Sequence, residues 1–147
     1  MSRPVPDEVL LGLLTAQPSY GYDLLERFRS NKHLGRIWHL STSQMYAVLK
    51  RLEEKGAIRG DDIDVEDAPS RREYHVLPAG QVQLDRWLYT QEPSASLHRI
   101  RVVFLSRLYI AALLNRSITE IFHNQIKTCK QQRQEFEKEQ QKKISTI

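Results

Sequence analysis

Hydrophobic residues in the first third of the chain recur every three or four positions, which predicts three helices. They span about Pro6 to Thr15, about Tyr20 to Ser30, and about Thr42 to Lys55. Pro6 suits a first helical turn, and Ser19 can act as the N-cap of the second helix. The stripes expected to face the core are Val9, Leu10, Leu13 and Leu14; Tyr20, Leu24, Leu25 and Phe28; and Met45, Val48, Leu49 and Leu52.

The hydrophobic period changes after Gly56. Two short segments, 57–59 and 73–77, have the alternation and residue types of strands, and the segment between them is polar and acidic. Another helix follows from Pro78 to about Tyr89. The order helix, helix, helix, hairpin, helix predicts a winged helix-turn-helix with a two-stranded wing over residues 1–92, in a mostly α chain.

Residues 93–147 show helical periodicity from Ser94 onward and no strand signal. Ser117 and Glu120 fit a capping box at the start of the last helix. From Lys130 the sequence favours helix but has almost no apolar positions, which predicts an exposed or frayed tail. We therefore expect a separate helical region after the winged helix-turn-helix.

The third helix has the most complete end signals. Ser41 and Gln44 fit a capping box, and Gly56 supplies a left-handed C-cap. A helix that enters a major groove needs short residues for close approach, donors for base edges and cations for phosphates. Its outer face meets these needs with Ser43, Ala47 and Lys50, flanked by Tyr46 and Arg51.

Two interpretations of this helix remain open. Its charged residues fit a DNA-reading surface, but they also fit any solvated helix with charge pairs. Gln44 is equally ambiguous, because its amide can complete the cap or reach a base.

The hairpin favours the DNA-binding interpretation. Arg71 and Arg72 begin its second strand, where a wing would meet the phosphate backbone, and Arg59 lies on its first strand. The connecting loop carries carboxylates that phosphates would repel, so we expect its tip to point away from DNA or to stay mobile. These carboxylates are Asp61, Asp62, Asp64, Glu66 and Asp67. Their spacing does not match a known cation site.

Composition restricts the other classes of function. The chain has 147 residues, 40% hydrophobic and 27% charged, with a net charge of +4 that weakly favours an anionic partner. The longest apolar run, residues 108–114, is far too short to span a bilayer, and acidic Asp7 and Glu8 argue against a signal peptide. We expect a cytoplasmic protein without a membrane segment.

An enzyme is not expected. The sequence has no Gly-rich phosphate loop, no G-x-S-x-G, no H-E-x-x-H and no Cys/His cluster, and its five histidines are scattered. We therefore expect no catalytic residue, no cofactor and no metal. The candidate DNA-contacting residues are Ser41, Ser43, Gln44, Tyr46, Ala47, Lys50 and Arg51 on the third helix, and Arg59, Arg71 and Arg72 on the hairpin.

Four segments together resemble the PadR family of transcriptional regulators. The opening helix pair of that family resembles EVLLGLLTAQPSYGYDLLERF, and its recognition-helix block resembles IWHLSTSQMYAVLKRLEEKGAI. Its wing strand and following helix resemble SRREYHVLPAGQVQLDRWL, and the start of its C-terminal dimerisation domain resembles RIRVVFLSRLYIAALL.

The resemblance implies a homodimer that binds a pseudo-palindromic operator in double-stranded DNA and represses transcription. Relatives respond to phenolic acids, drugs or stress, and one branch modifies a cyanobacterial circadian clock; the sequence identifies no effector. The alternative is a winged-helix module that binds proteins and lacks specific DNA affinity. The dimerisation residues implied are Ile100, Val103, Phe104, Leu108, Ala111, Ile118, Phe122 and Ile126.

A few residues allow a second interpretation. Cys129 could sense oxidants if it met its symmetry mate, or it could be a small buried apolar residue. The tyrosines Tyr20 and Tyr22 and the tryptophans Trp38 and Trp87 could line a ligand pocket. Their positions on apolar stripes favour packing in the core.

Overall fold

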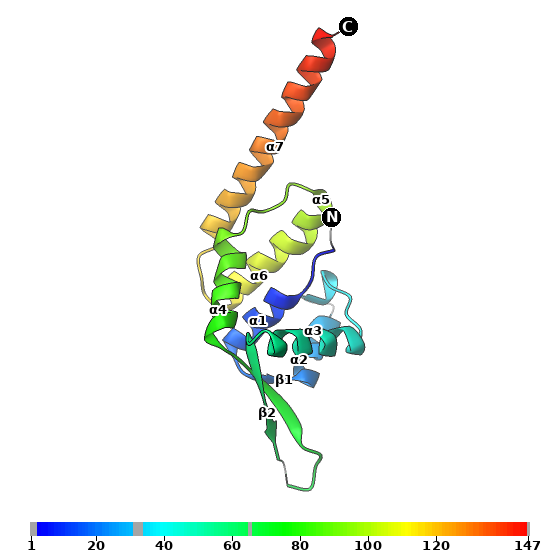
Figure 1. The fold of residues 1–147 in the computed structure, drawn as a ribbon, viewed down its shortest axis with the longest axis vertical. Coiled ribbons are helices and arrows are strands. Elements are labelled where there is room, and N and C mark those ends of the chain that lie inside the picture. Colours follow the sequence, from blue (N-terminus) through cyan, green and yellow to red (C-terminus); the bar gives the residue numbers. More distant parts are fainter. Residues whose placement is uncertain (1–2, 31–33, 65, 147) are drawn as a thin grey trace.

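The computed structural model describes residues 3–30, 34–64 and 66–146 (Figure 1). Residues 31–33, in the link predicted between the second and third helices, lie outside the described residues. In chain order the elements are α1 (Asp7–Ala16), β1 (Ser19–Tyr20), α2 (Gly21–Arg29), a 3-10 turn (Leu34–Arg36), α3 (Thr42–Glu54), β2 (Ile58–Ile63), β3 (Arg71–Val76), α4 (Pro78–Asp85), α5 (Leu97–Arg99), α6 (Leu105–Leu113) and α7 (Thr119–Ser145). Two π-helical turns, Arg86–Thr90 and Ile100–Phe104, extend α4 and join α5 to α6.

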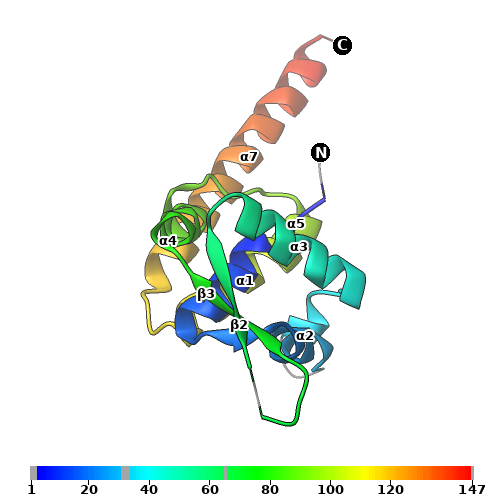
Figure 2. The same ribbon diagram turned by 60° about the horizontal axis from the view of Figure 1, so that its bottom comes forward.

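The three predicted helices, the hairpin and the following helix are all present, in the order of a winged helix-turn-helix. Their core stripes are buried as expected, apart from Tyr20, which is half-buried. Figure 2 shows the β2–β3 hairpin with α2 and α3 on one side of it and α4 on the other. The hairpin and α3 are therefore neighbours on one end of the molecule.

The sheet differs from the prediction in two respects, and the first is its three antiparallel strands in the order β1-β3-β2. Ser19 of β1 pairs with Tyr74 of β3, so it is not the N-cap of α2, and its hydroxyl donates to the carbonyl of Gln17. Tyr20 occupies the N-cap position without a side-chain hydrogen bond. β2 also runs beyond the predicted strand, because its pairing with β3 continues as far as Ile63 and Arg71.

One hydrophobic core serves both predicted regions. α1 lies at its centre, with Val9, Leu10 and Leu11 all at 0% exposure, and Ile110 and Ala111 of α6 belong to the same cluster. Close approach of α6 requires Gly12, since a Cβ there would lie 2.5 Å from Cγ2 of Ile110. Ala111 is fully buried within its own protomer, so its assignment to dimerisation is wrong.

α7 leaves the globular body and extends away from it at the end opposite the hairpin (Figure 1). Its N-cap is Ile118, without a side-chain hydrogen bond, so the capping box predicted for Ser117 and Glu120 does not form. The tail from Lys130 is exposed, as expected, but it is helical to Ser145. Residues such as Gln, Glu and Lys favour helix without any need for burial.

Candidate nucleic-acid interface

α3 is fixed at both ends by the local signals that the sequence contains. The backbone N–H of Gln44 donates to Oγ of Ser41 over 3.1 Å, and the N–H of Ser41 donates to Oε1 of Gln44 over 2.9 Å, which completes the capping box. At the other end Gly56 has a φ of 73°, and the N–H of Ala57 donates to the carbonyl of Leu52. This is a Schellman motif, so the helix has a defined start and a defined stop.

The entry to α3 is also anchored to the C-terminal helices. Nε1 of Trp38, three residues before the cap, donates to Oγ of Ser106 over 2.9 Å, and both residues are buried. Ser106 in turn donates to the carbonyl of Val102. The position of α3 is therefore linked to α6 through a buried polar contact, which the sequence analysis did not identify.

The outer face of α3 is open to solvent. Ser43, Ala47 and Lys50 are exposed, and Lys50 has no ion pair among the described residues. The caps use the hydroxyl of Ser41 and the amide oxygen of Gln44, so the capping role of Gln44 is confirmed.

Arg51 has a partner inside the protein. Its Nε and Nη2 donate to the two carboxylate oxygens of Asp7 over 2.9 and 2.6 Å, and the Asp7 side chain is only 5% exposed. These hydrogen bonds raise the pKa of Arg51 above its ordinary value. The pair joins α3 to the start of α1, so Arg51 has a structural role that the sequence analysis missed.

The ring of Tyr46, a residue of α3, lies against Gly21 at the start of α2. A Cβ at Gly21 would be 2.8 Å from both Cε1 and Oη of Tyr46, so the absence of a side chain at Gly21 allows the ring to sit there. Next to it is a pocket of about 600 Å³ between α2, α3 and β3. Its polar and aromatic lining includes Tyr20, Tyr22, Tyr46, Arg71, Arg72 and Tyr74.

The three wing arginines differ in their partners. Arg59 makes two hydrogen bonds to Asp61, of 3.0 and 3.2 Å. Arg72 donates to the carboxylates of Glu53 and Asp62. The Arg71 side chain has no hydrogen bond or ion pair among the described residues, and its guanidinium carbon lies 5.7 Å from the centroid of the Tyr20 ring. Arg71 is thus the wing cation most available to an external anion.

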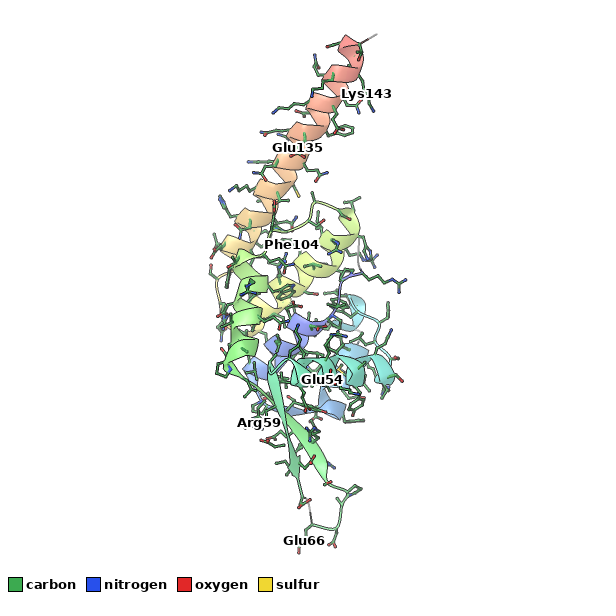
Figure 3. All side chains as sticks on the ribbon, viewed as in Figure 1. Glu54, Arg59, Glu66, Phe104, Glu135 and Lys143 are labelled. Carbon is green, nitrogen blue, oxygen red and sulfur yellow. The ribbon has the colours of Figure 1, made fainter. Side chains whose placement is uncertain are left out.

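The acidic loop lies at the far tip of the hairpin. In Figure 3, Glu66 marks this tip, whereas Arg59 and Glu54 lie nearer the body of the molecule. Asp61 and Asp62, which the prediction assigned to the loop, lie on β2 and form ion pairs with wing arginines. Asp61 also lies 3.6 Å from Nε2 of His75. Within residues 3–30, 34–64 and 66–146 no group of three or more His, Cys, Asp or Glu side chains is placed to hold a metal ion.

The residues assigned to dimerisation fall into two groups. Ile118, Phe122 and Ile126 are 42%, 41% and 50% exposed on the first turns of α7. Ile100, Val103, Phe104 and Leu108 are partly buried, and the Phe104 and Phe122 rings meet edge to face with centroids 5.2 Å apart. The neighbouring Leu97 is 86% exposed, an apolar surface residue that the sequence analysis did not identify.

The structure places four residues that had alternative interpretations. Trp38 and Trp87 are buried in the core, as their apolar stripes predicted, whereas Tyr22 is 64% exposed beside the pocket. Cys129 is half-buried and accepts a hydrogen bond from Nε2 of Gln125.

No helix in the described part of the chain has both the length and the apolar character needed to cross a membrane.

Comparison with known proteins gives consistent matches. The model of the transcriptional regulator PadR-like family matches residues 10–86, just over half of the chain. The negative transcriptional regulator PadR of Bacillus subtilis is 26% identical over 118 residues, which cover 80% of this chain and 63% of that protein. A probable transcriptional regulator of Mycobacterium tuberculosis is 27% identical over 84 residues, covering 57% of this chain and 43% of that protein.

A solved structure matches the same region. The crystal structure of Bacillus subtilis PadR in complex with operator DNA has a TM-score of 0.56 and 29% identity, over 61% of this chain and 50% of that chain. In each of these three comparisons the match spans less than two thirds of the relative's length.

Proposed function

Because the chain belongs to the transcriptional regulator PadR-like family, we propose that it is a sequence-specific DNA-binding regulator. In this proposal it acts in the cytoplasm as a dimeric repressor on a pseudo-palindromic operator. The observation that carries the proposal is α3, which is capped at both ends. Its outer face is exposed and carries short residues and Lys50, which has no ion-pair partner in the described part of the chain.

α3 is the proposed reading helix. Ser43 and Ala47 are small enough to let the helix approach the floor of a major groove, while Lys50 can donate to a guanine or to a phosphate. Gln44 uses its amide oxygen in the cap, so its contribution to DNA would come from the amide nitrogen. Arg51 is not included, because its guanidinium is bound to Asp7.

The pocket beside α3 is the proposed contact for the DNA backbone. The guanidinium of Arg71 is available there, and the hydroxyl groups of Tyr22 and Tyr46 belong to exposed side chains in the same lining. Arginine and tyrosine are common donors to phosphate oxygens, and such contacts fix the register of a protein on the duplex. The relative solved with operator DNA supports DNA as the partner.

The wing favours a second candidate. Two of its three arginines are paired with carboxylates of the same chain, which leaves fewer free cations for phosphates. A winged-helix module that binds another protein would have no need of free cations there. Such a module should show no preference among DNA sequences.

One titration separates the two candidates. Labelled duplex from upstream of the protein's own gene, and a scrambled duplex of equal length, would be titrated by fluorescence anisotropy at two salt concentrations. Preference for the upstream duplex that persists at the higher salt is expected of a specific regulator, because only phosphate contacts are strongly weakened by salt. If binding to both is equal and lost with salt, fragments selected from the genome would be tested, and failure of these too would overturn the proposal.

A further inference from the structure

Arg72 is enclosed by two carboxylates from different elements. Its Nε and Nη2 donate to Glu53 of α3 over 3.1 and 2.8 Å, and its Nη1 donates to Asp62 of β2 over 3.1 Å. The carboxylates raise the pKa of Arg72 above its ordinary value. Each of the three guanidinium nitrogens therefore has a carboxylate acceptor before any DNA arrives, and two of the five N–H donors remain.

This arrangement changes what a phosphate would meet at the wing. A phosphate oxygen that approaches the remaining N–H groups of Arg72 is repelled by the two carboxylates beside them, and a bidentate contact through Nε and Nη2 requires Arg72 to leave Glu53. The loop adds further negative charge, so residues 58–76 contain three arginines and six carboxylates. Arg72 therefore adds little affinity for a duplex that contacts the protein only at this wing.

We propose that Glu53 and Asp62 are specificity-determining residues, which withhold Arg72 from DNA of arbitrary sequence. The inference rests on the proposed function. Non-specific affinity comes almost entirely from phosphate contacts, so an arginine that is already neutralised lowers it. Specificity is the difference between the affinities for operator and for other DNA. An interaction that weakens binding to other DNA therefore increases specificity as effectively as a new contact to the operator.

The position of Glu53 links this device to the reading helix. Glu53 lies one turn after Lys50 on α3, whereas Asp62 belongs to the wing, so Arg72 joins the two parts of the DNA-facing surface. When the bases fit α3, the helix is held in the groove and the phosphates beside the wing are fixed at short range. Arg72 can then exchange a carboxylate for a phosphate while the duplex stays bound through α3.

The test compares two double variants that remove equal charge. In Glu53→Gln/Asp62→Asn both partners of Arg72 lose their charge. In Glu54→Gln/Asp64→Asn the same charge is removed from two exposed neighbours that have no ion pair in the described part of the chain. Each would be titrated with the scrambled duplex over a salt series, and its thermal unfolding would be measured to show that it is folded.

The proposal expects the first variant to bind the scrambled duplex about fivefold more tightly than the second, as for one extra exposed ion pair. The slope of log affinity against log salt should steepen by about 0.9, the value of one added phosphate contact. Adding Arg72→Ala to the first variant should return the slope to that of the unmodified protein. The ratio of affinities for operator and scrambled duplex should fall.

Equal slopes for the two double variants would overturn the inference, since Glu53 and Asp62 would then contribute only net charge. Weaker binding by the first variant would overturn it too, because the carboxylates would then hold Arg72 ready for DNA. A different result overturns the proposed function: the unmodified protein shows no preference among DNA sequences at any salt concentration. If none of the proteins binds any duplex, both fail.

Discussion

The buried carboxylate of Asp7, at the start of α1, accepts two hydrogen bonds from the guanidinium of Arg51 on α3. The two residues are 44 positions apart in the sequence. α1 lies at the centre of the core, so this pair joins α3, the proposed reading helix, to the core. An arginine that appears on a plot of α3 as a flank of the DNA-facing surface therefore serves the fold.

Arg51→Ala should destabilise the protein, because it leaves the Asp7 carboxylate buried without its partner. We expect a loss of about 1–3 kcal/mol in the free energy of unfolding, toward the lower end because the arginine side chain is 45% exposed. Urea unfolding would measure it. Lys50→Ala, one residue earlier and exposed, should change stability by less than about 0.5 kcal/mol. Equal losses of unfolding free energy in the two variants would mean that the ion pair contributes nothing to stability.

Lys50→Ala should instead weaken DNA binding. If Lys50 binds a phosphate, affinity should fall for all sequences and the salt slope should drop by about one; if it reads a guanine, specificity should relax at one operator position. Leu52→Ala, on the buried face of the same helix, should cost about 2–5 kcal/mol of stability. Operator affinity that is unchanged by Lys50→Ala would show that the reading face has been placed wrongly.

Gly21→Ala should weaken operator binding without unfolding the protein. The new Cβ would displace the Tyr46 ring, which is 45% exposed and can rotate away at little cost to the core. Gly12→Ala is the matched control, because its Cβ would meet buried Ile110 and should lower the melting temperature. Anisotropy and thermal unfolding would be measured on both. A folded Gly21→Ala protein with full affinity would exclude Tyr46 from the interface.

The stability of the protein should depend on pH through Glu8. Burial raises the pKa of its carboxyl above the ordinary value of 4.5, and the charge of neighbouring Asp7 raises it further. A carboxyl whose pKa is higher in the folded state favours folding when protonated, and this contribution is lost as the pH rises through the folded pKa. Glu8→Gln should therefore be more stable than the unmodified protein at neutral pH.

The difference should shrink as the pH falls below about 4.5, where Glu8 is protonated in both states. Chemical unfolding of the two proteins at matched pH values would measure it. Glu54→Gln, at an exposed position on α3, controls for the change in net charge. A Glu8→Gln protein that is less stable at neutral pH would show that the charged carboxylate has a favourable partner.

Local signals explain why α3 was predicted so completely. Its capping box, its apolar stripe and its C-terminal glycine all lie within residues 41–56, so no distant part of the chain was needed to recognise them. The same reasoning failed at Ser117, where the residue types of a cap are present but the chain begins α7 one residue later without using them.

The features that sequence reasoning missed depend on contacts between distant residues. β1 is only two residues long and exists because it pairs with β3. Ala111 was expected at a subunit interface, but α6 turns it inward against α1. Arg107 falls on the same helical face as Phe104 and Ala111, but its charge would assign it to the surface. It is 4% exposed and donates to the carbonyl of Trp87, and burial lowers its pKa to about 10.

The dimer predicted from the C-terminal helices can be tested on the first turns of α7. Phe122 and Ile126 are 41% and 50% exposed on α7, which extends away from the globular body, and burying such side chains against a second copy would contribute to association. We expect the protein to elute as a dimer from a sizing column with light scattering. Ile126→Asp should raise the dimer dissociation constant by roughly a hundredfold or more, because a two-fold interface contains every substitution twice.

Phe136→Asp is the matched control for this substitution. It places the same charge on the same helix at a residue that is 60% exposed, beyond the positions assigned to the interface, so the dimer should persist. Phe122→Asp tests the contact with Phe104 as well, and its unfolding must be measured because that ring pair belongs to one protomer. If the unmodified protein is a stable monomer, the operator cannot be read by two symmetric helices. If Phe136→Asp alone dissociates the dimer, the subunits meet along the outer half of α7.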